Sequence, residues 1–174
     1  GILRRRIEKA EQVIMWYRKR TVLFWIIIAV ALFLTGLAGA EQKNKIQKID
    51  IEDLDQVVRD GGRYLLVFMA AWCQPCIKEL PDVDALYEKY RDRGLKIVGI
   101  SVDFEGPTAM QPIVDRIKVN FPIYWLGEAA IDVYNIRGIP YIIFIKNGEI
   151  VDRLLGQRSK VYLDKKFEAF LTRP

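Results

Sequence analysis

The sequence predicts an α/β domain with a central β-sheet covered by helices on both faces, preceded by one N-terminal transmembrane helix. Short apolar runs typical of buried strands alternate with amphipathic helical patterns from residue 50 onward. Near the N-terminus, twenty consecutive residues carry no charge. The only two cysteines of the chain, Cys73 and Cys76, lie where an apolar run gives way to a helical pattern.

The first forty residues predict a membrane anchor. Residues 1–20 hold seven Lys or Arg and two Glu, and residues 21–40 are uncharged. Twenty helical residues span about 30 Å, the thickness of a bilayer's hydrocarbon core. The positive-inside rule then places residues 1–20 in the cytoplasm and the rest on the periplasmic, extracytoplasmic side of a bacterial inner membrane. Ala38-Gly39-Ala40 also fits a signal-peptidase site, but the length of the apolar stretch favours a retained signal-anchor.

The charge distribution and the residue composition bear on whether the chain binds nucleic acid, a metal or a cofactor. The net charge is +5, but the excess lies in residues 1–20 and the remainder is nearly balanced. This distribution argues against a nucleic-acid-binding domain. Residues 41–49 are polar and lysine-rich and are predicted to form a tether, which leaves residues 50–174 for one folded domain. The chain has no histidine and no further cysteine, so we expect no metal and no cofactor.

A helix and a buried strand are expected before the cysteines. Asp50 is a typical N-cap for a helix over residues 50–60, and Gly61-Gly62 ends the pattern. Residues 64–69 form a continuous apolar run, as expected for a central strand that is buried on both faces.

A long helix is predicted over residues 75–93, with an interruption at Pro81. Its apolar residues share one face with Cys76: Leu80, Val83, Leu86, Tyr87 and Tyr90. Glu79 falls in the same arc, where an unpaired carboxylate is costly. Either Glu79 reaches the rim or a cation, or it is a proton acceptor one turn from Cys76.

The remaining pattern predicts a second strand, an inserted helix, a hairpin and a last helix. The strand covers residues 95–102, and Thr108 is expected to cap a helix that runs to residue 118. Extended chain at 121–125 and a short helix at 129–134 follow. Residues 138–145 hold a proline immediately before a strand, and Asn147-Gly148 predicts a hairpin that joins this strand to residues 149–155. Residues 161–171 are predicted to form the last helix.

The spacing of the cysteines predicts thiol–disulfide exchange. At a helix N-terminus, free N–H groups and the helix dipole stabilise a thiolate on Cys73, and Cys76 lies one turn further on, where it can resolve a mixed disulfide. A structural staple that closes so short a loop contributes about 2 kcal/mol at most. A zinc site lacks further ligands, and two inert thiols would require neither this spacing nor Pro75 between them.

Three segments carry a resemblance to a known family: residues 71–81 (AWCQPCIKELP), residues 98–103 (VGISVD) and Gly138-Ile139-Pro140. Over residues 46–171 the chain resembles the thioredoxin fold with an inserted helix in the middle. More closely, it resembles the membrane-anchored ResA/TlpA-like thiol–disulfide oxidoreductases.

The resemblance implies roles for individual residues. Cys73 corresponds to the nucleophile, Cys76 to the buried resolving thiol, and Glu79 to a glutamate near the pair. Pro140 corresponds to a cis-proline that faces the disulfide and helps bind the substrate backbone. Five residues are expected to contact substrate: Trp72, Gln74, Pro75, Ile139 and Pro140.

Two departures from related families bear on function. Thioredoxin has a buried aspartate where this chain has Val67, so a proton acceptor would have to come from elsewhere. Some cytochrome-maturation relatives have a glutamate where this chain has Tyr141, which weakens the case for the haem pathway. Gln74 and Pro75 place no cation beside a Cys73 thiolate, and an ionised Glu79 would repel that thiolate. Because strong oxidants of this fold depend on a stabilised thiolate, both features favour a reductant.

The sequence therefore predicts a protein disulfide reductase that acts on extracytoplasmic clients, with apocytochrome c as one candidate. A membrane thiol electron donor would re-reduce it, because no glutathione pool serves that compartment. A disulfide oxidase or isomerase with the same cysteines, and a non-catalytic thioredoxin-like assembly factor on the membrane, are the alternatives. A peroxidase is disfavoured, because neither cysteine has the threonine and proline setting of peroxiredoxins.

Overall fold

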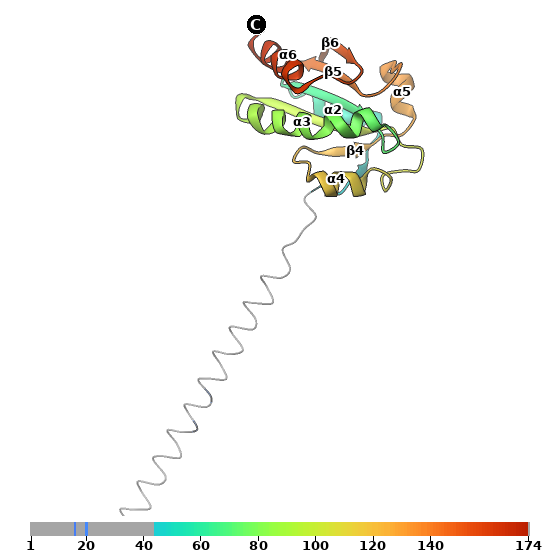
Figure 1. The fold of residues 1–174 in the computed structure, drawn as a ribbon, viewed down its shortest axis with the longest axis vertical. Coiled ribbons are helices and arrows are strands. Elements are labelled where there is room, and N and C mark those ends of the chain that lie inside the picture. Colours follow the sequence, from blue (N-terminus) through green and yellow to red (C-terminus); the bar gives the residue numbers. More distant parts are fainter. Residues whose placement is uncertain (1–15, 17–19, 21–43, 174) are drawn as a thin grey trace, which may run out of the picture. The chain divides into compact units, whose positions relative to one another are not determined.

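The computed structural model describes residue 16, residue 20 and residues 44–173 (Figure 1). The predicted transmembrane segment, residues 21–40, and most of the predicted basic segment lie outside the described residues. Within the described part of the chain, no helix is both long and apolar enough to cross a membrane. The unit that begins at Asn44 holds the sheet and the cysteines.

The unit is built on one six-stranded sheet with the order β1-β4-β3-β2-β5-β6. The pairs β1–β4, β4–β3 and β3–β2 are parallel, whereas β5 runs antiparallel to both β2 and β6. The strands are β1 (Gln47–Lys48), β2 (Arg63–Met69), β3 (Leu95–Ser101), β4 (Ile123–Trp125), β5 (Tyr141–Lys146) and β6 (Glu149–Leu155). The helices are α2 (Ile51–Val58), α3 (Gln74–Tyr90), α4 (Gln111–Ile117), α5 (Ala129–Tyr134) and α6 (Lys160–Thr172), with a 3₁₀ turn η1 (Arg91–Arg93).

Continuous apolar runs place β2, β3 and β5 at the centre of the core. Leu65 is fully buried on one face of β2, and Leu66 and Phe68 are fully buried on the other. Side chains on both faces of a strand can be buried only if both faces of the sheet are covered, as the sequence predicts. Helix α3 packs beside α6 and α4 (Figure 1).

Local signals account for two elements as expected. The Asp50 carboxylate accepts a hydrogen bond from the backbone N–H of Asp53 at 2.8 Å and so caps α2. Asn147 and Gly148 both have positive φ, 54° and 82°, which the two-residue turn between β5 and β6 requires.

Several boundaries differ from the sequence-based expectation, most clearly those of β1, α4 and α3. Residues within the predicted 41–49 tether form β1, because Ile46 and Ile49 are buried and Gln47 pairs with Tyr124 of β4. Helix α4 begins at Gln111 rather than after Thr108, and its N-cap Met110 is fully buried, so a core contact replaces the expected hydroxyl cap. Helix α3 continues through Pro81 and ends at Tyr90.

The topology brings several strand ends to one edge of the sheet. Met69 pairs with Ser101, and Ser101 pairs with Trp125, so the carboxyl ends of β2, β3 and β4 lie together. The amino end of the antiparallel β5 lies at the same edge, since Tyr141 pairs with Phe68. The carboxyl ends of parallel strands are the usual place for a functional site.

Candidate active site

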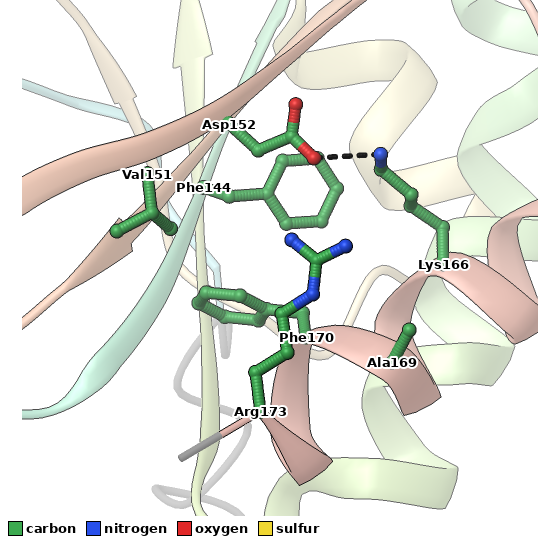
Figure 2. Close-up of a pocket in the computed structure, with 7 residues that line it drawn as sticks. All are labelled: Phe144, Val151, Asp152, Lys166, Ala169, Phe170 and Arg173. Carbon is green, nitrogen blue, oxygen red and sulfur yellow. Dashed lines mark ion pairs between the residues drawn. The ribbon is translucent and has the colours of Figure 1, made fainter.

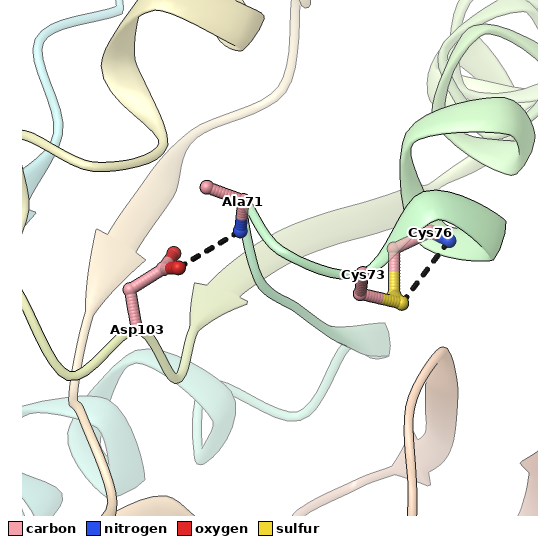
Figure 3. The surroundings of a disulfide bond; sticks show 4 residues. All are labelled: Ala71, Cys73, Cys76 and Asp103. Atoms are coloured by element: carbon pink, nitrogen blue, oxygen red, sulfur yellow. Dashed lines mark hydrogen bonds between the residues drawn. A yellow bond between two sulfur atoms is a disulfide. The ribbon is translucent and has the colours of Figure 1, made fainter.

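The two cysteines form a disulfide at the N-terminus of α3. The Sγ atoms are 2.06 Å apart, and Cys73 is the N-cap of the helix. The Cys73 Sγ accepts a hydrogen bond from the backbone N–H of Cys76 at 3.2 Å (Figure 3). Pro75 fits in the first turn because no intrahelical bond is lost there. The Cys73 sulfur therefore occupies the place where a helix stabilises an anion.

Both cysteines are buried beneath an exposed rim. Cys73 is 5% exposed and Cys76 is 3% exposed, so exposure alone does not separate a nucleophile from a resolving thiol. Trp72, Gln74 and Pro75 are exposed around them, as expected for residues that meet another molecule. The distinction between the two cysteines lies in their position on α3: Cys73 caps the helix and Cys76 lies within its first turn.

The peptide bond between Ile139 and Pro140 is cis, as the family resemblance implies. Pro140 is buried and Ile139 is half-buried. Because Phe68 of β2 pairs with Tyr141 of β5, Pro140 lies one position beyond this pair, beside the end of β2 that leads to the cysteines. The carbonyl of Pro140 accepts a hydrogen bond from the N–H of Gly156 at 2.8 Å.

Glu79 is 2% exposed, so its carboxylate does not reach the rim. It accepts a hydrogen bond at 2.7 Å from the backbone N–H of Arg158, in the loop between β6 and α6. Burial raises the pKa of Glu79, while the N–H and the charge of Arg158 act in the opposite direction. Through Gly156, the same loop holds the Pro140 carbonyl. Glu79 thus connects α3 to the segment that supports the cis-proline.

Asp103 is a buried carboxylate that sequence reasoning did not assign to the site. It is 1% exposed, and its Oδ1 accepts from the N–H of Ala71 at 2.8 Å (Figure 3). Its Oδ2 accepts from the Ser101 hydroxyl at 2.7 Å, and its carbonyl accepts from the Trp125 indole N–H at 2.7 Å. Asp103 therefore holds the start of the loop that carries Cys73. The available signal was an aspartate directly after a buried strand, at the carboxyl edge of a parallel sheet.

Neither of two further hollows in the described part of the chain is lined by the cysteines. A cavity of about 10 Å³ between β6 and α6 has room for about one water and contains the Asp152–Lys166 ion pair (Figure 2). A pocket of about 380 Å³ is lined by residues on both sides of Pro140 in the sequence. Its lining residues are Asn135, Arg137, Tyr141, Arg153 and Leu155.

Comparison with known proteins agrees with this geometry. The AhpC/TSA family matches residues 38–153. The ResA thiol–disulfide oxidoreductase of Halalkalibacterium halodurans is 32% identical over 134 residues, 75% of this chain and 76% of the relative. The ResA protein of Bacillus anthracis is 31% identical over 120 residues, 68% of this chain and 66% of the relative's own length.

A solved structure extends the likeness to the fold. The crystal structure of a thiol:disulfide interchange protein of the thioredoxin family from Chlorobium tepidum has a TM-score of 0.59 and 27% sequence identity. The match covers 67% of this chain and 84% of that one. With its thioredoxin-like α/β fold, the chain belongs to the AhpC/TSA family and to the ResA thiol–disulfide oxidoreductases.

Proposed function

We propose that the chain reduces disulfides of extracytoplasmic client proteins with Cys73 as the nucleophile and Cys76 as the resolving thiol. The observation that carries the proposal is the Cys73 Sγ at the N-cap of α3, where it accepts the N–H of Cys76. In the reduced protein the same N–H group and the helix dipole would stabilise a Cys73 thiolate and lower its pKa.

The reaction transfers two electrons and two protons to the client. The Cys73 thiolate attacks one client sulfur, the client S–S bond breaks, and the departing client thiolate takes a proton. The Cys76 thiolate then attacks the Cys73 sulfur and releases the second client thiolate, which also takes a proton. The product on this chain is the Cys73–Cys76 disulfide that the structure contains.

The exposed rim and the cis-proline segment are the proposed client contacts. Trp72, Gln74 and Pro75 are exposed next to the nucleophile. The segment with Ile139 and Pro140 lies at the same sheet edge, where an extended client backbone could lie alongside it. This arrangement supports a protein client, because an extended backbone can contact the exposed residues of the loop and the cis-proline segment together.

The proposed direction is reduction of the client. Gln74 and Pro75 place no cation beside the sulfurs, and Glu79 adds a buried carboxyl group to the same helix. Strong oxidants depend on an unusually stabilised thiolate, with potentials near −120 mV against about −270 mV for thioredoxin. A measured potential below about −180 mV supports reduction, and a higher one reverses the direction.

Glu79 is proposed as a proton acceptor for the pair. Its buried position and raised pKa support this role, although one of its oxygens is already bound to the Arg158 N–H. The test is the alkylation rate of Cys73 against pH. A Glu79→Gln variant should shift this profile, and superimposable profiles would remove the proposed role.

The proposed setting is the outer face of a bacterial inner membrane, with residues 21–40 as the anchor. A membrane thiol electron donor would then restore the dithiol, and apocytochrome c is the proposed client. The basic residues before this uncharged stretch support the setting. Extraction of the full chain with alkaline carbonate tests the anchor: an anchored chain stays with the membrane pellet.

Client trapping tests the whole proposal. Cys76→Ser should retain a client on Cys73 as a mixed disulfide that migrates as a larger species on non-reducing gels. Cys73→Ser with Cys76 intact is the matched control and should retain none. Reduction of insulin by the wild-type protein, and loss of that reduction in both variants, completes the test. Faster reoxidation of reduced ribonuclease than reduction of insulin would favour an oxidase instead.

A further inference from the structure

Two aromatic rings stack in the open beside the disulfide. The rings of Trp72 and Phe104 lie with centroids 6.0 Å apart and planes only 7° from parallel. Trp72 is 55% exposed and Phe104 is 63% exposed. By contrast, the ring pair of Phe144 and Phe167 is fully buried. The stack of Trp72 and Phe104 therefore adds little to the core.

The loops that carry the two rings are held together from below. Trp72 follows Ala71, whose N–H binds the Asp103 carboxylate at 2.8 Å, and Phe104 directly follows Asp103. Just before these residues, the N–H of Val102 donates a hydrogen bond to the carbonyl of Met69 at 2.9 Å. The rings are thus placed by hydrogen bonds of the loops that carry them rather than by burial of the rings themselves. A surface that is fixed in advance loses little conformational entropy when another molecule binds.

Aromatic side chains are enriched where proteins contact their partners, and these two lie beside the residue proposed to react with the client. Each aromatic side chain can bury at most about 150–250 Å². Two rings are therefore too small for a stable dimer interface, which needs about 800 Å² per partner. They match the size of one large side chain. Because Trp72 adjoins Cys73, the residues that flank a client's cysteine in the mixed disulfide must pass within one or two residue lengths of this stack.

We propose that Trp72 and Phe104 form a binding platform for an apolar or aromatic side chain next to the reactive cysteine of an extended client peptide. Phe104 is the specificity-determining residue, and Asp103 is a positioning residue that holds both loops. This inference rests on the proposed disulfide reductase function and names the feature of the client that the same site selects. An aromatic contact of this type contributes about 0.5–1.5 kcal/mol, or about 2- to 13-fold in rate.

The test compares two disulfide-bridged peptides that differ only in the residue beside the cysteine, tryptophan in one and serine in the other. Stopped-flow measurement with the reduced protein gives a rate for each, and each rate is divided by the same protein's rate with hydroxyethyl disulfide. For the wild type we expect the tryptophan peptide to react about 2- to 13-fold faster. In Phe104→Ser the ratio of the tryptophan-peptide rate to the serine-peptide rate should fall towards one. Phe104→Trp, which keeps an aromatic ring at this position, should keep the wild-type ratio.

The matched control is Val151→Ser, which removes a 48% exposed apolar side chain from the edge strand β6. It should keep the wild-type ratio. A wild-type ratio of one, or an unchanged ratio in Phe104→Ser, overturns the platform while leaving the reductase function in place. Failure of the wild type to reduce hydroxyethyl disulfide at all would instead overturn the function on which the platform rests.

Discussion

Carboxylates are used differently at the two ends of the sheet. At the carboxyl ends of β2 and β3, Asp103 and Glu79 are buried and accept hydrogen bonds from the backbone N–H groups of other segments. Near the start of β3 and the end of α3, exposed carboxylates pair with exposed side-chain cations. These pairs are Asp60–Lys96, Asp164–Lys89 and Glu168–Arg93.

The difference separates groups that position the site from groups that cover the surface. A buried N–H without an acceptor costs about 1–3 kcal/mol, so each buried carboxylate fixes the loop that it binds. An exposed ion pair contributes little, because water and salt screen it and two long side chains lose freedom. Substitutions at the two ends should therefore differ in their effect on the free energy of unfolding, even though all remove a carboxylate.

The largest effect is expected for Asp103→Ala. The substitution leaves the Ala71 N–H and the Ser101 hydroxyl without their acceptor beneath the disulfide. We expect the free energy of unfolding in urea to fall by about 3 kcal/mol. Asp103→Asn keeps one carbonyl acceptor and should lose less. If Asp103→Ala and Asp103→Asn unfold at the wild-type urea concentration, the buried carboxylate does not hold this loop.

A smaller effect is expected for Glu79→Ala, which removes the acceptor of a single N–H, that of Arg158. We expect the free energy of unfolding to fall by about 2 kcal/mol.

The variant Glu79→Gln retains an acceptor oxygen and isolates the effect of the charge of Glu79. Because burial raises the pKa of Glu79, the folded protein binds more protons than the unfolded chain above the ordinary value of 4.5. The wild type should then lose stability relative to Glu79→Gln as pH rises from 4.5 towards neutrality. Parallel stability curves from pH 4.5 to 7 would contradict the raised pKa.

The same contrast explains how far the sequence alone could lead. Continuous apolar runs predict β2 and β3, and the Asn147-Gly148 turn predicts the hairpin between β5 and β6. These signals are local, since each depends on neighbouring residues. The spacing of Cys73 and Cys76 at the start of a helix is a local signal as well, and it predicts the disulfide that the structure contains.

Features that depend on distant pairing were missed. Strand β1 has only two residues, Gln47 and Lys48, and exists because β4 offers a partner far along the chain. In the sequence, Asp103 simply follows a predicted strand, and no nearby residue indicates that its carboxylate accepts a hydrogen bond from the N–H of Ala71. Phe104 carries no sequence signal at all, since its ring meets Trp72 only through the parallel pairing of β2 and β3.

The smallest effect is expected for Glu168→Gln, at the other end of the comparison. Glu168 forms a bidentate pair with Arg93, with N–O distances of 2.7 and 2.8 Å, a favourable geometry for an ion pair. Both side chains are nearly half exposed, at 46% for Arg93 and 44% for Glu168, so solvent screens their attraction. We expect the urea midpoint of Glu168→Gln to equal that of the wild type within error, and 1 M NaCl to leave both unchanged. A midpoint shift as large as that of Asp103→Ala would show that geometry, rather than burial, decides how much a carboxylate contributes here. The two ends of the sheet would then not differ in kind.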